Sequence, residues 1–505
     1  MKNDVLIIGA GGAGLTAALH AKEKGASVRV LTKEYPTRSQ TCMAQGGINA
    51  ALGNNGEDSI ESHIANTLKS AHGMANEDAV RHLCENAPDA VKWLDSIGVC
   101  FSRDKDAKIA QRSLGGASSP RACHAQDYTG LKILHSLYDK CLSEGIEILN
   151  EKFLLDVITD NGEVCGVSVL DIRSGEVEVY ESKSVIVATG GYSRVYDKYS
   201  TNSTASTGDG IVSALRAGAK LKDMAFVQFH PTGLKNSSIL ISESARGAGG
   251  YLINSKGERF VNELRPRDEV ARAINEQVLN GEEVFLDIRH LGEEFINEEL
   301  PQERKLAKLY ENIDPLTDLI PIKPVAHYTM GGIEVDKNSS TCIKGLYAAG
   351  ECANHGVHGA NRLGGNSLLE LIVFGKQAGQ SAAAYALAHN AAHRAAENID
   401  VNKYAQRDDE NAIELDFYKI KEEIGELFYK NVGIVRCEKD LLLAQDTIKE
   451  IQSKLHLMGA VDTSKIYNTN RIEFLEFKNI LELCAYVVRE ALDIKESCGA
   501  HYRVD

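Results

Sequence analysis

The sequence DVLIIGAGGAG at residues 4–14 decides the fold of this 505-residue chain. Its apolar run at 5–8 predicts a buried strand, residues 15–24 suit a helix that Gly25 closes, and residues 28–31 predict a second strand. A strand, a glycine-rich turn, a helix and a second strand in this order are typical of a βαβ unit. They predict a parallel sheet covered by helices.

Three glycines in this turn, Gly9, Gly11 and Gly14, fit the pattern G-x-G-x-x-G. They permit a tight turn and let backbone N–H groups approach a pyrophosphate at the positive end of a helix. Taken alone the pattern can mark a plain tight turn, but the strand and helix around it favour a dinucleotide site. The second strand runs into Thr32-Lys33-Glu34 where an acidic residue for the ribose is usual. We therefore expect a different sugar contact, with Thr32 as a candidate.

Two later segments repeat the theme of a buried strand that ends at small residues. They are SVIVATGG at 184–191 and GLYAAGE at 345–351. Their distance from the first motif suggests one nucleotide-binding sheet assembled from separated parts of the chain. So much of the chain serves the cofactor that a long, buried FAD is favoured over a nicotinamide. TGDG at 207–210 adds another glycine turn with a carboxylate.

The composition excludes several classes of protein. A formal net charge of −15 argues against a general nucleic-acid binder. No apolar run approaches the roughly 18–20 residues that a bilayer span needs. We expect no secretory leader, because the apolar run at 5–8 already leads into the glycine turn. The eleven cysteines contain no CxxC pair, so we expect reduced thiols and neither zinc nor an iron–sulfur cluster. His389 and His393 have helical spacing, but a solvated helix face is the better interpretation, and no metal site is predicted.

The organisation along the chain predicts three structural units. Residues 1–229 and 325–396 would form two parts of one cofactor-binding domain, and the different material at 230–324 would be inserted between them. A polar stretch at 397–411 is a plausible linker. Residues 412–505 should be helical, because apolar residues recur on one helix face in two segments. These residues are Phe417, Ile420, Ile424, Leu427 and Phe428, and then Ile480, Leu483, Cys484, Val487, Val488 and Ala491.

The polar motifs of the middle and later parts of the chain form a set. They are VQFHPTG at 227–233, SESARG at 242–247, RPRD at 265–268, HYTMGG at 327–332 and HGANRLGGNS at 358–367. Together they resemble the flavoprotein subunit of succinate dehydrogenase and fumarate reductase, whose superfamily includes L-aspartate oxidase. The resemblance runs from residue 4 to GAHYR at 499–503, and YPTRSQ at 35–40 with AQGG at 44–47 favours the succinate/fumarate branch. It implies an α/β fold: a Rossmann-like FAD-binding domain, an inserted α+β capping domain and a C-terminal helical domain.

The resemblance also implies roles for individual side chains. The substrate contacts would be His230, Thr232, His327 and Arg362. Arg267 would be the proton donor or acceptor, with Glu243 and Arg246 relaying protons. A dianion needs several cationic or hydrogen-bonding groups, and arginine grips carboxylates bidentately. An arginine with a pKa above about 12 is an unusual acid, but it stays charged and can protonate a strong carbon base if Glu243 resupplies it.

Plainer interpretations stand beside these roles. A lone His230 would more often be a core residue, and the matching set around it reverses those odds. Glu243 and Arg246, three residues apart, could be an ordinary ion pair on a helix face. We expect His124, His355 and His358 to lie in loops or behind the site.

The motifs and the resemblance together predict the cofactor contacts. They are Gly9, Gly11, Gly14, Thr32, Lys33, Ser39, Gln40, Thr41, Gln45, Gly46, Gly47, Ala188, Thr189, Gly190, Asp209, Glu351, Asn366, Ser367 and Leu368. In membrane-bound respiratory members a histidine in Arg-Ser-His-Thr carries a covalent flavin bond. Here that position is Gln40, whose amide cannot form the bond, so FAD should be non-covalent and fumarate reduction favoured.

Two further departures concern the substrate and the partners. An aromatic residue commonly precedes Gly-Gly near the substrate, and Leu114 stands there in this chain. The sequence also stops soon after GAHYR, where respiratory members continue into a region that helps to dock an iron–sulfur subunit. The mode of partnering is therefore left open.

The function that this set predicts is hydride transfer between FAD and fumarate/succinate. Electrons would come through an iron–sulfur partner from a quinone or thiol donor, in the cytoplasm or at the inner face of the membrane through partner subunits. L-Aspartate oxidase, which makes iminoaspartate, is the main alternative, although such oxidases generally lack the Tyr-Pro-Thr-Arg-Ser sequence. A non-catalytic flavin-binding protein is a further alternative, and the intact Arg267, His327 and Arg362 set speaks against it.

Overall fold

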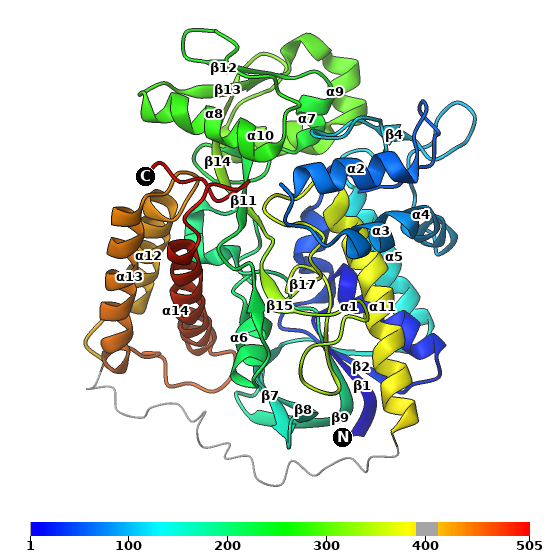
Figure 1. The fold of residues 1–505 in the computed structure, drawn as a ribbon, viewed down its shortest axis with the longest axis vertical. Coiled ribbons are helices and arrows are strands. Elements are labelled where there is room, and N and C mark those ends of the chain that lie inside the picture. The colour runs from blue at the N-terminus through cyan, green and yellow to red at the C-terminus, as the bar shows by residue number, and fades with distance from the viewer. Residues whose placement is uncertain (1, 390–412) are drawn as a thin grey trace.

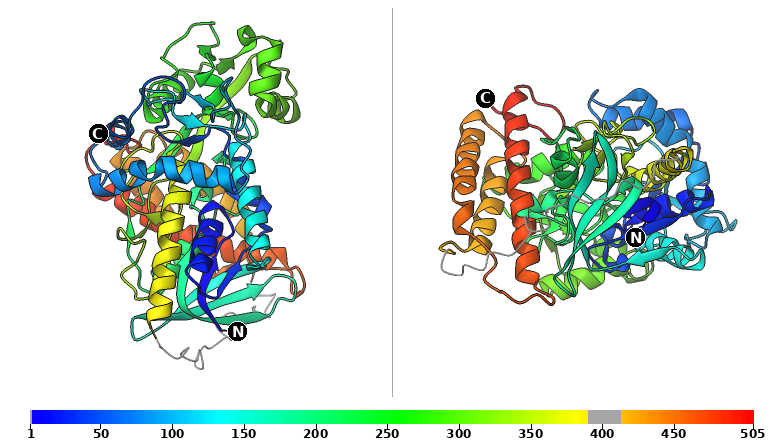
Figure 2. Two further views of the ribbon diagram at one scale, coloured as in Figure 1. Left: turned by 90° about the vertical axis from the view of Figure 1, so that its right-hand side faces the viewer. Right: turned by 90° about the horizontal axis from the view of Figure 1, so that it is seen from below.

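The computed structural model describes residues 2–389 and 413–505. Figure 1 shows a central sheet with helices beside it, a smaller sheet with its own helices at one end, and a group of C-terminal helices along one side. Seen along the other axes in Figure 2, the C-terminal helices stay on one side of the sheet and the amino-terminal helices on the other. The arrangement is the predicted α/β architecture with an inserted and a C-terminal unit.

The central sheet has seven strands in the order β6-β2-β1-β9-β8-β7, with β16 also pairing with β9. Their bounds are β1 Lys2–Ile8, β2 Val28–Leu31, β6 Glu147–Leu149, β7 Lys152–Asp160, β8 Glu163–Asp171, β9 Val177–Val187 and β16 Leu346–Ala348. β1 runs parallel to β2 and β9, and β9 runs parallel to β16. The predicted joining of three distant segments in one sheet is therefore correct.

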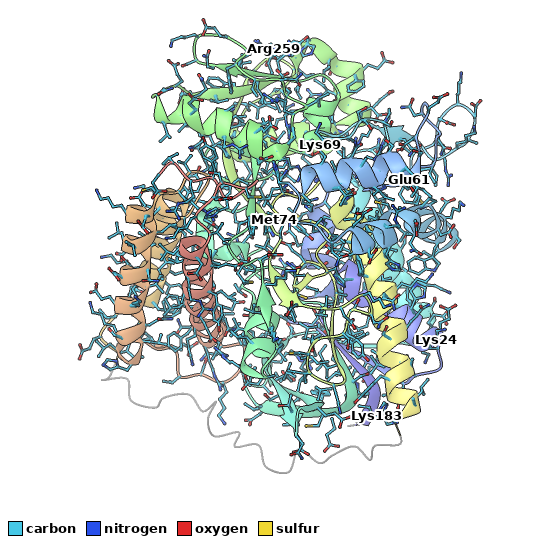
Figure 3. All side chains as sticks on the ribbon, in the orientation of Figure 1. Lys24, Glu61, Lys69, Met74, Lys183 and Arg259 are labelled. Carbon is cyan, nitrogen blue, oxygen red and sulfur yellow. The ribbon has the colours of Figure 1, made fainter. Side chains whose placement is uncertain are left out.

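The ends of these parallel strands come together at one edge. Ile8 is in register with Leu31 of β2 and with Val187 of β9, and Val187 is in register with Ala348 of β16. In Figure 3, Lys183 lies near the amino edge of the sheet and Arg259 lies at the far end of the inserted unit. The carboxyl edge, where ligands bind in open α/β sheets, thus faces the inserted unit.

Helix α1 (Gly12–Glu23) begins inside the glycine turn, three residues earlier than predicted, and is buried along most of its length. It packs against α11 (Asn366–Ala388), where two glycines allow close approach. A Cβ at Gly375 would lie 2.8 Å from Ala13 O, and one at Gly379 would lie 2.3 Å from Ala17 O. Glycine at positions 375 and 379 therefore lets the two helices pack closely.

The unit built on the central sheet has further helices and short strands. They are α2 Ile60–Ser70, α3 Glu77–Glu85, α4 Ala87–Ser96, α5 Thr129–Ser143 and α6 Asp209–Arg216, with short strands β3 Ile48–Asn49, β4 Gln111–Arg112, β5 Ala122–Cys123, β10 Leu221–Lys222, β15 Gly332–Glu334 and β17 Ala353–Asn354. The 3₁₀ turn η2 (Gln40–Met43) follows β2 and lies close to α5. It begins with Gln40, the residue at the position where respiratory members carry the flavin-binding histidine.

The inserted unit is an antiparallel sheet in the order β11-β14-β13-β12 with helices around it. Its elements are β11 Val227–Leu234, α7 Glu243–Gly247, β12 Tyr251–Asn254, α8 Arg267–Leu279, β13 Val284–Asp287, α9 Glu293–Glu299, α10 Pro301–Glu311 and β14 Ile320–Thr329. It has its own apolar core, which includes Leu252, Ile274 and Leu286. The predicted limits at 230 and 324 fall inside β11 and β14 and remain predictions.

The C-terminal unit consists of α12 (Phe417–Asn431), α13 (Glu438–Ser453) and α14 (Thr469–Asp493). The predicted apolar faces point inward: Phe417, Ile424 and Phe428 are buried in the same core as Val487 of α14. The predicted linker at 397–411 and His393 lie outside the described residues. His389 ends α11, exposed, with its ring stacked on Tyr385. No helix within 2–389 or 413–505 is long and apolar enough to span a membrane.

The glycine turn provides a test of the fold. Gly9 has φ +107°, and a Cβ there would lie 2.2 Å from Ala188 O of the neighbouring strand segment. Gly25, at the end of α1, has φ +89°, but a Cβ there would meet no described atom within 4 Å. Gly25→Ala should therefore lower the free energy of unfolding only by the roughly 1–2 kcal/mol that left-handed backbone strain costs. Gly9→Ala should lower it clearly more, because its Cβ would also clash. Calorimetric unfolding of both FAD-free variants measures the difference, and equal losses would contradict the close approach.

Candidate functional site

A cavity of about 1580 Å³, its open mouth included, runs along the carboxyl edge of the central sheet to the inserted unit. The cavity reaches from the glycine turn at Gly9 to Arg267 of the inserted unit. Most of the predicted site residues line it: Gly9, Gly11, Thr32, Lys33, Ser39, Gln40, Thr41, Gln45, Gly46, Gly47, Ala188, Thr189, Gly190, Asp209, His230, Glu243, Arg267, His327, Glu351, Arg362, Ser367 and Leu368.

Two predicted cofactor contacts lie behind the wall instead of in it. A Cβ at Gly14 would meet Gly9 O at 2.0 Å, so this glycine allows the turn to pack on its own helix. Asn366 is fully buried, and its side chain bonds Asn49 at 2.8 Å and His63 at 2.9 Å. Both residues support the turn and the start of α11, and neither faces the cavity.

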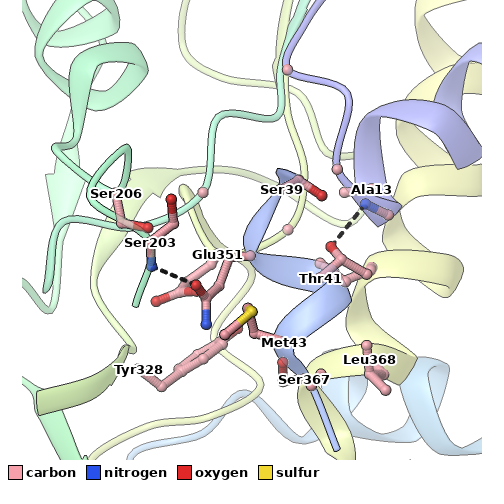
Figure 4. Close-up of a pocket in the computed structure, with 18 of the residues that line it drawn as sticks. Ala13, Ser39, Thr41, Met43, Ser203, Ser206, Tyr328, Glu351, Ser367 and Leu368 are labelled. Carbon is pink, nitrogen blue, oxygen red and sulfur yellow. Dashed lines mark hydrogen bonds between the residues drawn. The ribbon is translucent and has the colours of Figure 1, made fainter. Parts of the chain in front are cut away.

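At the glycine turn the structure leaves donors and acceptors for a ligand. Thr41 Oγ1 accepts a hydrogen bond from Gly12 N at 3.0 Å (Figure 4). Three other polar atoms in the wall, Ser39 Oγ, Gln45 Oε1 and Thr189 Oγ1, are buried without a partner among the described residues. Because buried polar atoms are almost always bonded, these atoms fit a bound polar group. The first turn of α1 carries no acidic residue, which suits a pyrophosphate.

The second strand ends in residues that are already engaged. Thr32 Oγ1 donates to Glu34 O at 3.0 Å, so towards a ribose Thr32 can offer only acceptor lone pairs. The Lys33 ammonium bonds Asp209 and Glu476, each at 2.6 Å, and Lys33 is among the residues that line the cavity. The charge of Lys33 thus organises the wall, and its ammonium is already engaged.

Gln40 lies where the family's flavin attachment would be. Its Oε1 accepts from Ser203 N at 2.6 Å, which ties η2 to the loop before α6 (Figure 4). Glu351 lines the same region, and its Oε1 accepts from Thr329 N at 2.9 Å. Burial raises the pKa of Glu351 to about 7 despite these bonds. The carboxyl is therefore partly protonated near neutral pH.

Two histidines face each other at the other end of the cavity. The rings of His230 and His327 are 4.9 Å apart, and His327 Nδ1 is 2.8 Å from Thr201 Oγ1. Burial, and after it the charge of Arg267, lowers the pKa of each histidine well below its usual range. Both imidazoles are therefore neutral at pH 7 and act as hydrogen-bonding groups.

Thr232 does not line the cavity but fixes His230. Its backbone N–H donates to His230 Nδ1 at 3.2 Å, and its hydroxyl donates to Ile241 O at 2.6 Å. Because Nδ1 accepts, the hydrogen of the neutral ring must be on Nε2. Thr232 therefore orients His230 in this structure, and its direct contact with a substrate stays a prediction.

Arg362 is held by a residue that was not predicted from the sequence. Its guanidinium lies 4.3 Å from the ring centroid of Tyr328, and its Nε has no partner among the described residues. The Tyr328 hydroxyl in turn donates to Glu370. Burial, and then Arg267, lowers the pKa of Arg362 to about 10, so the guanidinium remains charged at neutral pH. Tyr328 directly follows His327 in HYTMGG, which is the signal that could have identified it.

Glu243 is buried between two arginines. Arg267 donates to its Oε2 from Nη2 at 2.6 Å and from Nε at 2.9 Å, and Arg246 Nη2 lies 3.6 Å from its Oε1. Burial by itself raises the pKa of Glu243, but Arg267 and Arg246 outweigh it and lower the pKa. With Glu243 and Arg246 each about 1% exposed, an ordinary ion pair on a solvated helix face is excluded. Arg246 lies behind Glu243, outside the cavity wall.

Gln228 joins the two arginines of the site and was also missed. Its Oε1 accepts from Arg267 Nη1 at 3.1 Å, and its Nε2 donates to Arg362 O at 2.8 Å. Gln228 stands two residues before His230 on β11, inside the motif quoted above. Other wall residues lie outside the quoted motifs and have no such signal: Met43, Lys152, Leu154, Ser203, Ala205, Ser206 and Leu240.

Several remaining predictions can be placed. Leu114 lines the cavity, and the following Gly115 N donates to Glu243 Oε1 at 2.9 Å. His355 and His358 lie outside the wall, near Glu370; His358 Nε2 is 3.0 Å from its Oε2. His124 is likewise buried outside the wall. No cluster of three metal-ligating side chains occurs within the part of the chain that the structure describes.

Behind the start of α7 lies a buried pair of acids. Asp127 Oδ2 accepts from Gln302 N at 2.7 Å, and Glu303 Oε1 accepts from Ser242 N at 3.0 Å. Burial raises the pKa of Asp127 to about 6, and burial together with Asp127 raises that of Glu303 to about 8. Ser242 caps α7, so this pair supports the turn that carries Glu243.

The raised pKa of Glu303 predicts how stability depends on pH. The folded state holds this proton more tightly than the unfolded chain, so its contribution is complete below about pH 4.5 and is lost as pH rises through about 8. Glu303→Gln, which cannot ionise, should therefore lose less thermal stability than the parent between pH 6 and 9. Calorimetric Tm values across this range measure it, with exposed Glu294→Gln on α9 as control. Parallel profiles for parent and Glu303→Gln would contradict the assignment.

Comparison with known proteins agrees with this geometry. The family described as FAD binding domain matches residues 4–368, and that described as Fumarate reductase flavoprotein C-term matches residues 421–505. The 8-methylmenaquinol:fumarate reductase flavoprotein subunit of Wolinella succinogenes is 41% identical over 99% of this chain and 86% of its own length. The succinate dehydrogenase flavoprotein subunit of Rickettsia bellii is 38% identical over 100% and 90%.

Solved structures extend the likeness to three dimensions. A variant of E. coli quinol fumarate reductase superposes with a TM-score of 0.94 at 36% identity, over 100% of this chain and 91% of that one. The adenylylsulfate reductase of Archaeoglobus fulgidus, at 17% identity and a TM-score of 0.75, shares the fold alone. The predicted family and fold are confirmed, and so is FAD as the cofactor. This chain belongs to the fumarate reductase/succinate dehydrogenase flavoprotein family of FAD-dependent oxidoreductases that act on CH–CH groups.

Proposed function

We propose that this flavoprotein subunit works as a fumarate reductase with non-covalent FAD and with Arg267 as the proton donor. The observation that supports it most is the Arg267–Glu243 pair, whose closest atoms are 2.6 Å apart at the wall of the cavity. His230, His327 and Arg362 line the same end of the cavity. Together these groups suit a small dicarboxylate.

The binding part of the proposal rests on charge. At this end of the cavity Arg267 and Arg362 carry two positive charges against the negative charge of Glu243, and the two histidines are neutral. Glu351, near Arg362, is partly protonated, so this end has a positive excess. A dianion such as fumarate supplies the missing negative charge. Arg362 would clamp one carboxylate, while His230 donates from Nε2, the nitrogen that Thr232 leaves protonated.

The proton-transfer part of the proposal rests on the contacts of Glu243 with Arg267 and Arg246. When bound, FAD exchanges a hydride with the dicarboxylate. Arg267 would donate a proton to the carbon that does not receive the hydride. Glu243, with two bonds to Arg267, would return a proton to it, and Arg246 on the far side of Glu243 would continue the path. Thr232 would act on the reaction through the orientation of His230.

Electrons would enter through a partner. Relatives of this chain include an 8-methylmenaquinol:fumarate reductase and a quinol-fumarate reductase, whose names give quinols as reductants. We propose by analogy that an iron–sulfur subunit supplies electrons to this chain from a quinone or a thiol donor. The work would then take place in the cytoplasm or at the inner face of the membrane, through partner subunits.

The proposal predicts the outcome of changing Arg267. Arg267→Ala and Arg267→Lys should each lower fumarate reduction by at least about 100-fold, the size of a lost general acid, while FAD content stays at the parent level. Reduced viologen serves as the electron donor, and absorbance of the purified protein gives the FAD content. The control is Arg272→Ala, one turn further along α8, where Arg272 pairs with Asp268 at 2.9 Å.

Two results would contradict the function. One is substantial fumarate turnover by Arg267→Ala, which would remove Arg267 as the proton donor. The other is aspartate-dependent peroxide formation by the parent without fumarate turnover, which would make the chain an L-aspartate oxidase.

The position of Gln40 predicts how the flavin leaves the protein. A glutamine amide forms no histidyl-type bond, so acid precipitation should release all of the yellow colour into the supernatant. Absorbance of pellet and supernatant measures the partition, and a related flavoprotein with covalent FAD provides the control. A pellet that stays yellow after washing would show covalent attachment and contradict this part of the proposal.

A further inference from the structure

Lys33 is the centre of a buried cluster that joins three parts of the chain. Its Nζ lies 2.6 Å from Asp209 Oδ2, 2.6 Å from Glu476 Oε1, 3.0 Å from Thr207 Oγ1 and 3.1 Å from Ala205 O. An ammonium has three hydrogens, so these four acceptors occupy all of them. The cluster links the end of β2, the loop before α6, and α14 of the C-terminal unit.

This cluster lies against the cofactor cavity. Lys33, Ala205 and Asp209 are in the wall, together with Ser203 and Ser206 of the same loop. In Rossmann folds the end of the second strand lies beside the ribose of the adenosine half. The loop that Lys33 grips is therefore a wall of the adenosine end of the FAD site.

Two side chains of α14 complete the cluster from outside the wall. Glu476, 8% exposed, takes one bond of Lys33, and Asn479 Nδ2 donates to Asp209 Oδ1 at 2.9 Å. Burial by itself lowers the pKa of Lys33, but Asp209 and Glu476 outweigh it and raise the pKa. A buried cation held by two carboxylates depends on each of them, since removal of one leaves charge and hydrogen bonds uncompensated.

We infer that Glu476 and Asn479 are positioning residues of the FAD site, and that FAD binding and docking of the C-terminal helical unit are energetically coupled. Glu476 fixes Lys33, Asn479 fixes Asp209, and these in turn fix the loop that walls the adenosine end. Because such coupling is reciprocal, FAD stabilises the docking of α14 as much as α14 strengthens FAD binding. The inference rests on FAD as the cofactor and not on the proposed reaction.

A second ion pair between the same helices provides a matched control. Arg216 of α6 bonds Glu482 of α14 at 2.7 Å, with side chains 39% and 33% exposed. Neither residue lines the cavity. Pairs this exposed contribute little to stability, so Glu482→Gln removes a contact of α14 without touching the wall. Figure 1 shows α6 and α14 as neighbours along this contact.

The test is FAD affinity of the full chain, prepared free of FAD and titrated by flavin fluorescence. Glu476→Gln and Asn479→Ala should each raise the Kd for FAD, by about tenfold or more for Glu476→Gln, as expected for loss of a charge-assisted bond. Glu482→Gln should leave the Kd within about twofold. FAD should also raise the Tm of Glu476→Gln by less than it raises that of the parent.

A double-mutant cycle identifies the route. If Glu476 acts through Lys33, Glu476→Gln should weaken FAD binding much less in a Lys33→Met background than in the parent. Equal effects in both backgrounds, or a parent-like Kd in Glu476→Gln, would overturn the inference. Circular dichroism shows whether Glu476→Gln folds. If it does not, the Kd of Asn479→Ala for FAD decides whether the inference holds. Fumarate turnover at saturating FAD is measured separately, so failure of the proposed reaction leaves this result readable.

Discussion

The site depends on the burial of one carboxylate, that of Glu243, between Arg267 and Arg246. A charge about 1% exposed persists only with close partners, and here each oxygen has one. Oε2 accepts from Arg267, and Oε1 accepts from Gly115 N of the FAD-binding domain. The bond to Gly115 crosses between the inserted unit and the central one, so the same carboxylate that holds the proposed proton donor also holds the two units together.

This constraint explains why the other site residues have the states they have. Clustered arginines lower the pKa of His230 and His327 further than burial alone, so the positive charge of the cavity resides in guanidinium groups. Gln228, which is neutral, bonds Arg267 and the backbone of Arg362 without reducing that charge. The end of the cavity with the two arginines therefore stays short of negative charge until an anionic ligand enters.

The sequence was informative where the residues of one site are neighbours along the chain. The glycine turn predicted the first strand and helix, and the motif set placed Arg267 and Arg362 in one wall. It was not informative about partners that meet only in the fold. Tyr328 reaches Arg362 because β14 runs beside the cavity, and Glu476 reaches Lys33 across more than four hundred residues. Thr232 and Arg246 lie in the right motifs, but side-chain direction puts each of them behind a residue that faces the cavity.

The loop before α6 is held in place by two side chains of the segment that follows β2. Gln40 holds the loop at Ser203 N, and Lys33 holds it at Ala205, Thr207 and Asp209. Gln40 and Lys33 both belong to the segment that follows β2, so one short stretch of chain holds the loop before α6 in place. A wall held in this way loses less conformational entropy when a ligand binds. Under the proposed non-covalent binding, retention of the flavin depends on contacts with such a preorganised wall.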